Sequence, residues 1–169
     1  MANATLLVGP LDRVLYFRTL PEMDRLSAAH LAAIAAHARE EFFPRGSTLI
    51  AADEQVETLY LVVDGQVALA RSGQPEGEAG PGASVGLLHL LARTESGLEA
   101  TAVTDTLTLR LDWDDHLDVC EEHFPILEQY LWHLSDRMVE QLQAAPELLH
   151  GTRAAPVLDV PEARNLDVV

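Results

Sequence analysis

The sequence predicts an α+β fold, with antiparallel strands between N-terminal helices and a long C-terminal helix. Residues 58–70 combine β-branched and aromatic side chains with an Asp64-Gly65 pair, which suits the positive φ angles of a hairpin turn. Residues 107–111 alternate leucine with threonine and arginine, the pattern of a strand that buries one face. In residues 125–145, apolar side chains recur at spacings of three and four, which predicts a long helix.

Shorter helices are expected on both sides of the strands. Residues 11–20 read as a short amphipathic helix, and residues 27–40 as an alanine-rich helix with Ser27 as a possible N-cap. Residues 113–122 are expected to form another short helix after the last strand. That helix is interrupted near Phe124-Pro125, because proline suits the first turn of a new helix.

A glycine-containing loop follows the hairpin. Residues 81–86 read Pro-Gly-Ala-Ser-Val-Gly, and the apolar run that comes next could begin a short helix. Such a turn can present backbone N–H groups to an anion. The loop is therefore a candidate ligand cradle.

Four segments of the sequence, taken in chain order, match the motifs of a known family. They are residues 43–50 with Gly46 after Phe43, residues 59–67 with Gly65, residues 81–86 with two glycines, and residues 102–111. Together they resemble the cyclic-nucleotide-binding domain of the catabolite-activator and cyclic-nucleotide-gated families, and the likeness covers residues 11–143. The resemblance implies an antiparallel β jelly-roll, flanked by N-terminal helices and a long C-terminal helix.

Two charged residues of that family are missing from this cradle. The family places a glutamate after the second glycine for the ribose hydroxyl, and about ten residues later an arginine for the cyclic phosphate. Here the first position is Leu87, the second falls at or near Ser96, and the nearby arginine is Arg93. Loss of such a buried ion pair typically costs about 2–5 kcal/mol. We expect a degenerate pocket, unless Arg93 enters the cradle.

The candidate pocket combines the cradle with the strand that follows it. Its candidate ligand-binding residues are Gly82, Val85, Gly86, Leu87, Leu88, His89, Arg93, Ser96 and Thr101. The imidazole of His89 could hydrogen-bond a ligand or simply pack, and packing is the preferred interpretation.

The long helix is the expected homodimer interface. In relatives this helix lies over the pocket and forms a dimer seam, and here one stripe combines Leu127, Tyr130, Leu131, Leu134, Met138 and Leu142. The alternative is that the stripe only covers the mouth of the barrel. Trp132 and His133 fall off the stripe, so they are expected at a second surface or in solvent.

Charge and composition limit the other partners. The net charge is −16 and all eleven cations are scattered arginines, which opposes binding to DNA. Fewer than thirty residues follow Gln143, too few for the winged helix-turn-helix of related transcription factors. No apolar run approaches membrane-spanning length, so we expect a cytoplasmic protein without membrane insertion. Cys120 is the only cysteine, which excludes an internal disulfide.

Neither a metal site nor enzymatic activity is expected. His116, Cys120 and His123 have a helical spacing that would suit soft metal ligands, but such spacing is common by chance. We therefore predict no metal and no cofactor. Since no nucleophile–base pair or phosphate-binding lysine loop is recognisable, the chain is not expected to be an enzyme.

These observations lead to one functional hypothesis and one alternative. We expect an N-terminal extension at residues 1–10, one domain at residues 11–145, and an extended or disordered tail at residues 146–169 that could instead dock in the cradle or on a partner. The domain is predicted to be a regulatory or adaptor module that dimerises and binds an unknown protein. The alternative is a small-molecule sensor that binds cyclic AMP, cyclic GMP or another metabolite.

Overall fold

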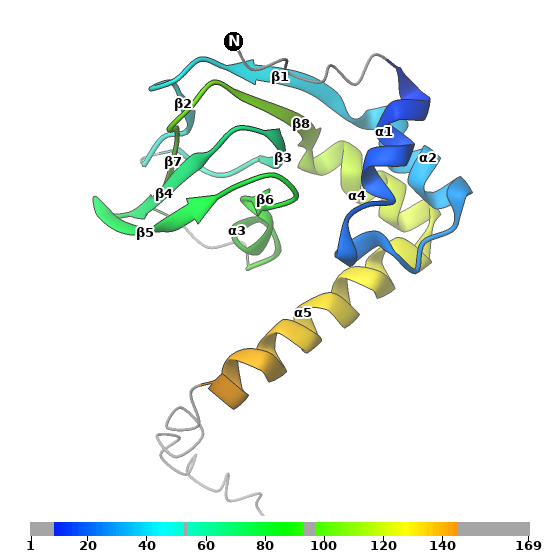
Figure 1. Cartoon of the computed structure of the whole chain (residues 1–169). Coiled ribbons are helices and arrows are strands. Elements are labelled where there is room, and N and C mark those ends of the chain that lie inside the picture. The colour runs from blue at the N-terminus through cyan, green and yellow to red at the C-terminus, as the bar shows by residue number, and fades with distance from the viewer. Residues whose placement is uncertain (1–8, 53, 93–96, 145–169) are drawn as a thin grey trace, which may run out of the picture. The chain divides into compact units, whose positions relative to one another are not determined.

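The computed structural model describes residues 9–52, 54–92 and 97–144 (Figure 1). The chain divides into two compact units, Met1–Leu131 and Trp132–Val169. The first unit contains all the described strands. The tail expected at residues 146–169 and most of the expected N-terminal extension lie outside the described residues.

Two four-stranded antiparallel sheets form the centre of the first unit. One has the order β1-β8-β3-β6, with bounds β1 Arg39–Phe43, β8 Thr106–Asp112, β3 Thr58–Asp64 and β6 Ser84–Val85. The other has the order β2-β7-β4-β5, with bounds β2 Thr48–Ile50, β7 Leu98–Ala102, β4 Val67–Arg71 and β5 Gln74–Ala79. This arrangement confirms the predicted antiparallel jelly-roll (Figure 1).

The hairpin turn between β3 and β4 lies where the sequence predicts it. Gly65 has a φ of +96°, and a Cβ atom at this position would lie 2.6 Å from the carbonyl oxygen of Asp105. Only glycine meets both the backbone angle and the close approach. The pair at residues 64–65 is thus explained by the fold of the hairpin.

The helices lie before, within and after the strands. Their bounds are α1 Pro10–Phe17, the 3-10 helix η1 Pro21–Met23, α2 Ala28–His37, α3 Leu87–Ala92, α4 Trp113–Glu122 and α5 Phe124–Ala144. The hydroxyl of Ser27 accepts a hydrogen bond from the His30 N–H at 3.3 Å, which confirms the predicted N-cap. None of the described helices is both long and apolar enough to span a membrane.

The second helix is shorter than predicted. The prediction extends it through residue 40, but α2 ends at His37 and Arg39 already pairs with Arg110 of β8. Backbone pairing with β8 thus replaces the last helical turn. Sheet pairing between residues about 70 positions apart is not visible in local periodicity.

The core has two parts that meet at strand β3. Tyr60 and Val62 pack inside the barrel, whereas Leu59 and Leu61 pack against the helices. Side chains alternate between the faces of a strand, so a strand buried on both sides reads as a continuous apolar run. In Figure 1, α1, α2 and α4 lie together beside the strands.

Candidate functional site

Both glycines of the predicted cradle have a structural role. Gly82 has a φ of +86°, and its N–H donates to the carbonyl oxygen of Val62 at 2.8 Å. Gly86 has a φ of +97°, and a Cβ atom there would lie 3.0 Å from the Thr58 carbonyl oxygen and 3.1 Å from Val56 Cγ1. Glycine at these positions lets the loop lie against β3, so its presence does not by itself indicate a ligand.

The helix that follows Gly86 presents leucine where the family has its glutamate. Leu87 is only 7% exposed and packs in the helical core, whereas Leu88 is 60% exposed. Val85 is buried inside the barrel. The residue after the second glycine is therefore an apolar core residue in this chain.

The remaining candidate residues are not all at the cradle. Thr101 lies between the buried Ala100 and Ala102 of β7, so its side chain points to the opposite face of that strand. Arg93 and Ser96 lie outside the described residues. Whether Arg93 enters the cradle stays a prediction.

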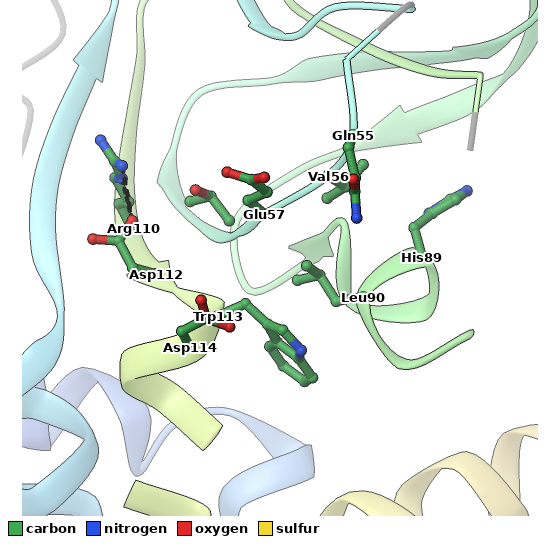
Figure 2. Close-up of a pocket in the computed structure, with 10 residues that line it drawn as sticks. Gln55, Val56, Glu57, His89, Leu90, Arg110, Asp112, Trp113 and Asp114 are labelled. Carbon is green, nitrogen blue, oxygen red and sulfur yellow. Dashed lines mark hydrogen bonds and ion pairs between the residues drawn. The ribbon is translucent and has the colours of Figure 1, made fainter. Parts of the chain in front are cut away.

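A pocket of about 470 Å³ lies beside α3, at the junction of β8 and α4. Figure 2 shows three segments around it. They contribute Gln55, Val56, Glu57, Thr58, His89, Leu90, Arg110, Asp112, Trp113 and Asp114. A second hollow of about 400 Å³ shares residues 55–58 and adds Leu49, Ile50, Glu54 and Tyr60.

Of the predicted ligand-binding residues that the structure describes, His89 alone lines the larger pocket. Sequence reasoning missed the segment at residues 55–58 and did not include Asp112 or Asp114 in the candidate pocket. These segments meet because the Trp113 N–H donates to the Glu57 carbonyl oxygen at 3.0 Å. No motif marks this contact, since it joins residues more than fifty positions apart.

The pocket is predominantly acidic. Glu57, Asp112 and Asp114 line it together with one cation, Arg110. The guanidinium of Arg110 donates to Asp112 Oδ1 from Nη2 at 2.8 Å and from Nε at 3.0 Å (Figure 2). This pairing raises the pKa of Arg110. Because its charge is already balanced, the lining disfavours an anionic ligand.

His89 is neutral in the arrangement that the structure describes. Its Nε2 atom lies 3.3 Å from Nη2 of Arg71, and a guanidinium can only donate, so Nε2 is the acceptor. Partial burial lowers the pKa of His89, and the charge of Arg71 lowers it further. In Figure 2 its imidazole points away from Trp113.

The possible metal ligands on α4 occupy different environments. His116 is fully buried and its Nε2 lies 2.9 Å from the Tyr130 hydroxyl oxygen. Burial raises the pKa of the Cys120 thiol to about 11. His123 is the residue after α4, and its ring lies 5.6 Å from that of His30. Within the described residues, no three potential ligands come together in a metal-binding group.

The residues of the predicted stripe on α5 differ in burial along the length of the helix. Tyr130 is buried and Leu127 packs against the same core, so this part of the stripe is used within the chain. Leu131 and Met138 are exposed, Leu134 is partly buried, and the side chain of Leu142 is not described. Among the side chains of α5 that the structure describes, the large apolar ones that are more than half exposed are Phe124, Leu131, Trp132, Met138 and Val139. We call these five residues the outer face.

Seven-residue spacing relates the members of the outer face. Leu131 follows Phe124 by seven residues and precedes Met138 by seven, and Trp132 precedes Val139 by the same interval. Seven residues make almost two helical turns, so these side chains share one side of the helix. Trp132, which the sequence pattern leaves off the stripe, belongs to this outer face.

Comparison with known proteins gives a consistent result. Residues 40–123 match the family model of the cyclic nucleotide-binding domain. No curated protein sequence matches the chain. Among solved structures, the catabolite activator protein of Thermus thermophilus has 25% sequence identity and a TM-score of 0.64, over 77% of this chain and 63% of that chain. This chain therefore spans less than two thirds of the Thermus protein.

Two other solved structures share the fold. The N-terminal domain of a transcriptional regulator from Streptomyces coelicolor A3(2) has 23% identity and a TM-score of 0.64, over 76% of this chain and 96% of that chain. The regulatory subunit of a cAMP-independent protein kinase A from Trypanosoma cruzi, bound to guanosine, has 18% identity. Its TM-score is 0.61, over 80% of this chain and 53% of that chain.

Proposed function

Because residues 40–123 belong to the cyclic nucleotide-binding domain family, we propose that this chain is a non-enzymatic regulatory module that acts as a homodimer. In this proposal it binds a protein partner and does not hold cyclic nucleotide in the usual way of the family. The outer face of α5 is the observation that carries the proposal. Covering five large apolar side chains on one helix removes apolar surface from water, which favours association.

The outer face fits a second copy of the same helix. Ile126 and Tyr130 pack in the core at the start of α5, whereas the five residues of the outer face are more than half exposed. Apolar residues at intervals of seven pack between two helices in a coiled coil. The predicted dimer helix is therefore retained, with Leu131 and Met138 at the seam and with Tyr130 and Leu127 assigned to the core of each chain.

The composition of the site supports a module that does not depend on cyclic nucleotide. Leu87 supplies no acceptor for a ribose hydroxyl, and the carboxylates around the pocket repel a phosphate. Arg110, the guanidinium that lines the pocket, is paired with Asp112. Among the described residues that line the pocket, binding in the family's mode would thus lack an unpaired cation, which typically costs about 2–5 kcal/mol.

Solution mass and titration calorimetry test the proposal. We expect the mass of a dimer by light scattering, a monomer for Met138→Glu, and a dimer for the matched control Arg137→Gln. Both substitutions lower the net charge by one, but Arg137 lies off the outer face. Cyclic AMP and cyclic GMP should produce no binding heat. A monomeric wild-type chain, or micromolar binding of either nucleotide, would contradict the proposal.

The pocket supports a second candidate, a sensor for a small molecule that carries no negative charge. Its volume of about 470 Å³ is within the usual size of ligand sites, and it joins α3 to the start of α4. Its acids favour a neutral or cationic ligand. The similar kinase subunit from Trypanosoma cruzi is bound to guanosine, a nucleoside without phosphate.

Tryptophan fluorescence can separate the two candidates. In a Trp132→Phe background, Trp113 is the remaining tryptophan and lies at the pocket. The sensor function predicts that guanosine or adenosine changes its emission, and that Asp114→Asn alters the apparent Kd. Unchanged emission at millimolar nucleoside would reject a nucleoside as the ligand.

A further inference from the structure

Arg71 lies at the end of an inward-facing row of side chains on β4. Val67 is buried in the barrel and Leu69 packs against the same cluster. Alternation along the strand places Arg71 on the same face as these two residues. Its partner on β7 is Leu98, which is also buried. The strand therefore directs a guanidinium to the rim of the barrel interior.

The guanidinium lies between β5 and α3. Nε donates to Glu76 Oε1 at 2.5 Å, and Nη2 lies 3.3 Å from Glu76 Oε2 and 3.3 Å from His89 Nε2. Nη1 makes no hydrogen bond to any residue that the structure describes. Arg71 is also the only basic residue within the four strands of its sheet.

The fork that Arg71 forms with Glu76 is the geometry by which arginine binds oxyanions. Two parallel N–H groups face the two oxygens of a carboxylate, and a phosphate presents its oxygens in the same way. Glu76 thus stands where an oxyanion of a ligand would bind. His89 adds a polar nitrogen next to that position.

The Glu76 carboxylate can be displaced from Arg71 with little loss of stability. The side chains of Arg71 and Glu76 are 49% and 39% exposed, and such exposed ion pairs contribute little to stability. The register between β4 and β5 shifts at this point, since Leu69 pairs with Gly77 and Ala70 with Pro75. Glu76 is the extra residue of this bulge, so its side chain is not fixed by a cross-strand partner.

We propose that Arg71 is an anion-binding residue, and that Glu76 occupies its oxyanion position until a phosphate or carboxylate group of a ligand displaces it. The site uses β4, β5 and α3, and differs from the acidic pocket at the start of α4. It goes beyond the proposed function, because dimerisation through α5 does not require it.

Nuclear magnetic resonance titration of the full chain tests the site, with inorganic phosphate as the probe. We expect phosphate to shift the Arg71 Nε–H resonance and the His89 ring resonances. Glu76→Gln should lower the Kd for phosphate about threefold, because the carboxylate that competes for Arg71 is removed. This factor corresponds to the free energy that an exposed ion pair typically contributes. Arg71→Gln should abolish the shift at His89. Arg45→Gln, which replaces an exposed arginine outside this site, should leave the Kd unchanged.

Further probes identify the source of the anion. Acetate and adenosine 5′-monophosphate present a carboxylate and a phosphate monoester to the same residues. A lower Kd for one of them than for inorganic phosphate assigns the ligand class. An unchanged Kd in Glu76→Gln, or a shift that persists in Arg71→Gln, would overturn the proposal.

Solution mass separates this inference from the proposed function. Arg71→Gln and Glu76→Gln should both keep the dimer mass and the melting temperature of the wild-type chain within a few degrees. If the chain is dimeric but does not bind phosphate, the anion site at Arg71 is rejected and the proposed dimer is retained. If the chain is monomeric but binds phosphate, the proposed dimer is rejected and the anion site is retained.

Discussion

His116 is a fully buried histidine with one described hydrogen-bond partner. Its Nε2 lies 2.9 Å from the hydroxyl oxygen of buried Tyr130, while Nδ1 has no partner in the described part of the chain. Burial, and then the charge of His37, lowers the pKa of His116 from 6.5 to about 4. The folded chain therefore keeps this imidazole neutral at a pH where the unfolded chain protonates it.

Acid should destabilise the fold through His116. Between pH 6.5 and 4 the unfolded chain binds more protons than the folded one, so stability falls as the pH is lowered through this interval. The full effect is about 3 kcal/mol. We expect urea denaturation to show this slope in the wild-type chain and in His133→Gln, but a smaller slope in His116→Gln. Equal slopes in all three proteins would exclude His116 as the cause.

Leu87 and Leu88 offer a matched test of the prediction that the cradle is degenerate. They are adjacent on α3, but Leu87 is 7% exposed and Leu88 is 60% exposed. Leu87→Glu, which restores the side chain of the family, should lower the free energy of unfolding by about 3 kcal/mol, because it places a carboxyl group in the helical core. Leu88→Glu should change it by less than about 0.5 kcal/mol.

Calorimetry on the same two variants addresses function. We expect no gain in cyclic AMP binding for Leu87→Glu, because the side chain at this position packs against the helices. A stable Leu87→Glu protein that binds cyclic AMP would show that the cradle lacks only its glutamate.

At the scale of elements, the junction of β6 and α3 combines an unusual backbone angle with a close contact. Gly46 and Gly86 both have a positive φ, +84° and +97°. A Cβ atom at Gly46 would have no neighbour within 4 Å, whereas one at Gly86 would meet the Thr58 carbonyl oxygen at 3.0 Å. Gly46→Ala should therefore report the cost of the backbone angle alone. The difference between the two substitutions measures how tightly the cradle loop packs on β3.

We expect Gly86→Ala to be more destabilising than Gly46→Ala by about 1–3 kcal/mol, since the Thr58 carbonyl group is backbone and cannot move easily. Chemical denaturation of both variants provides the measurement. Equal losses would mean that the loop shifts to accept the methyl group, and the close approach would then have no role in positioning α3.

Some features of the helices and strands could be predicted from local sequence patterns alone. Ser27 caps α2 as predicted, and Gly65 makes the predicted hairpin turn, because both depend on residues a few positions apart. The end of α2 was predicted three residues too late, since pairing of Arg39 with Arg110 decides it. Helical periodicity describes a segment alone and cannot include a strand that arrives about 70 residues later.

For the whole molecule, dimerisation should make stability depend on concentration. When folding is coupled to association, the melting temperature rises with protein concentration by mass action. We expect this rise for the wild-type chain and for Arg137→Gln, but not for Met138→Glu, because Met138 belongs to the outer face. Differential scanning calorimetry over a range of concentration of about a hundredfold checks it. A concentration-independent melting temperature in the wild-type chain would argue against the dimer.

The sequence by itself determined the order of the elements, the family and the leucine that stands where the family has its glutamate. These features depend on local propensity and on short motifs such as the glycines at positions 65, 82 and 86. The tertiary structure decided which side chains face one another. It buried Leu87, brought Glu57 to Trp113, placed Arg71 between Glu76 and His89, and left five large apolar side chains of α5 exposed. The physical reason is that a side chain's environment is set by packing between segments distant in sequence, which no local pattern contains.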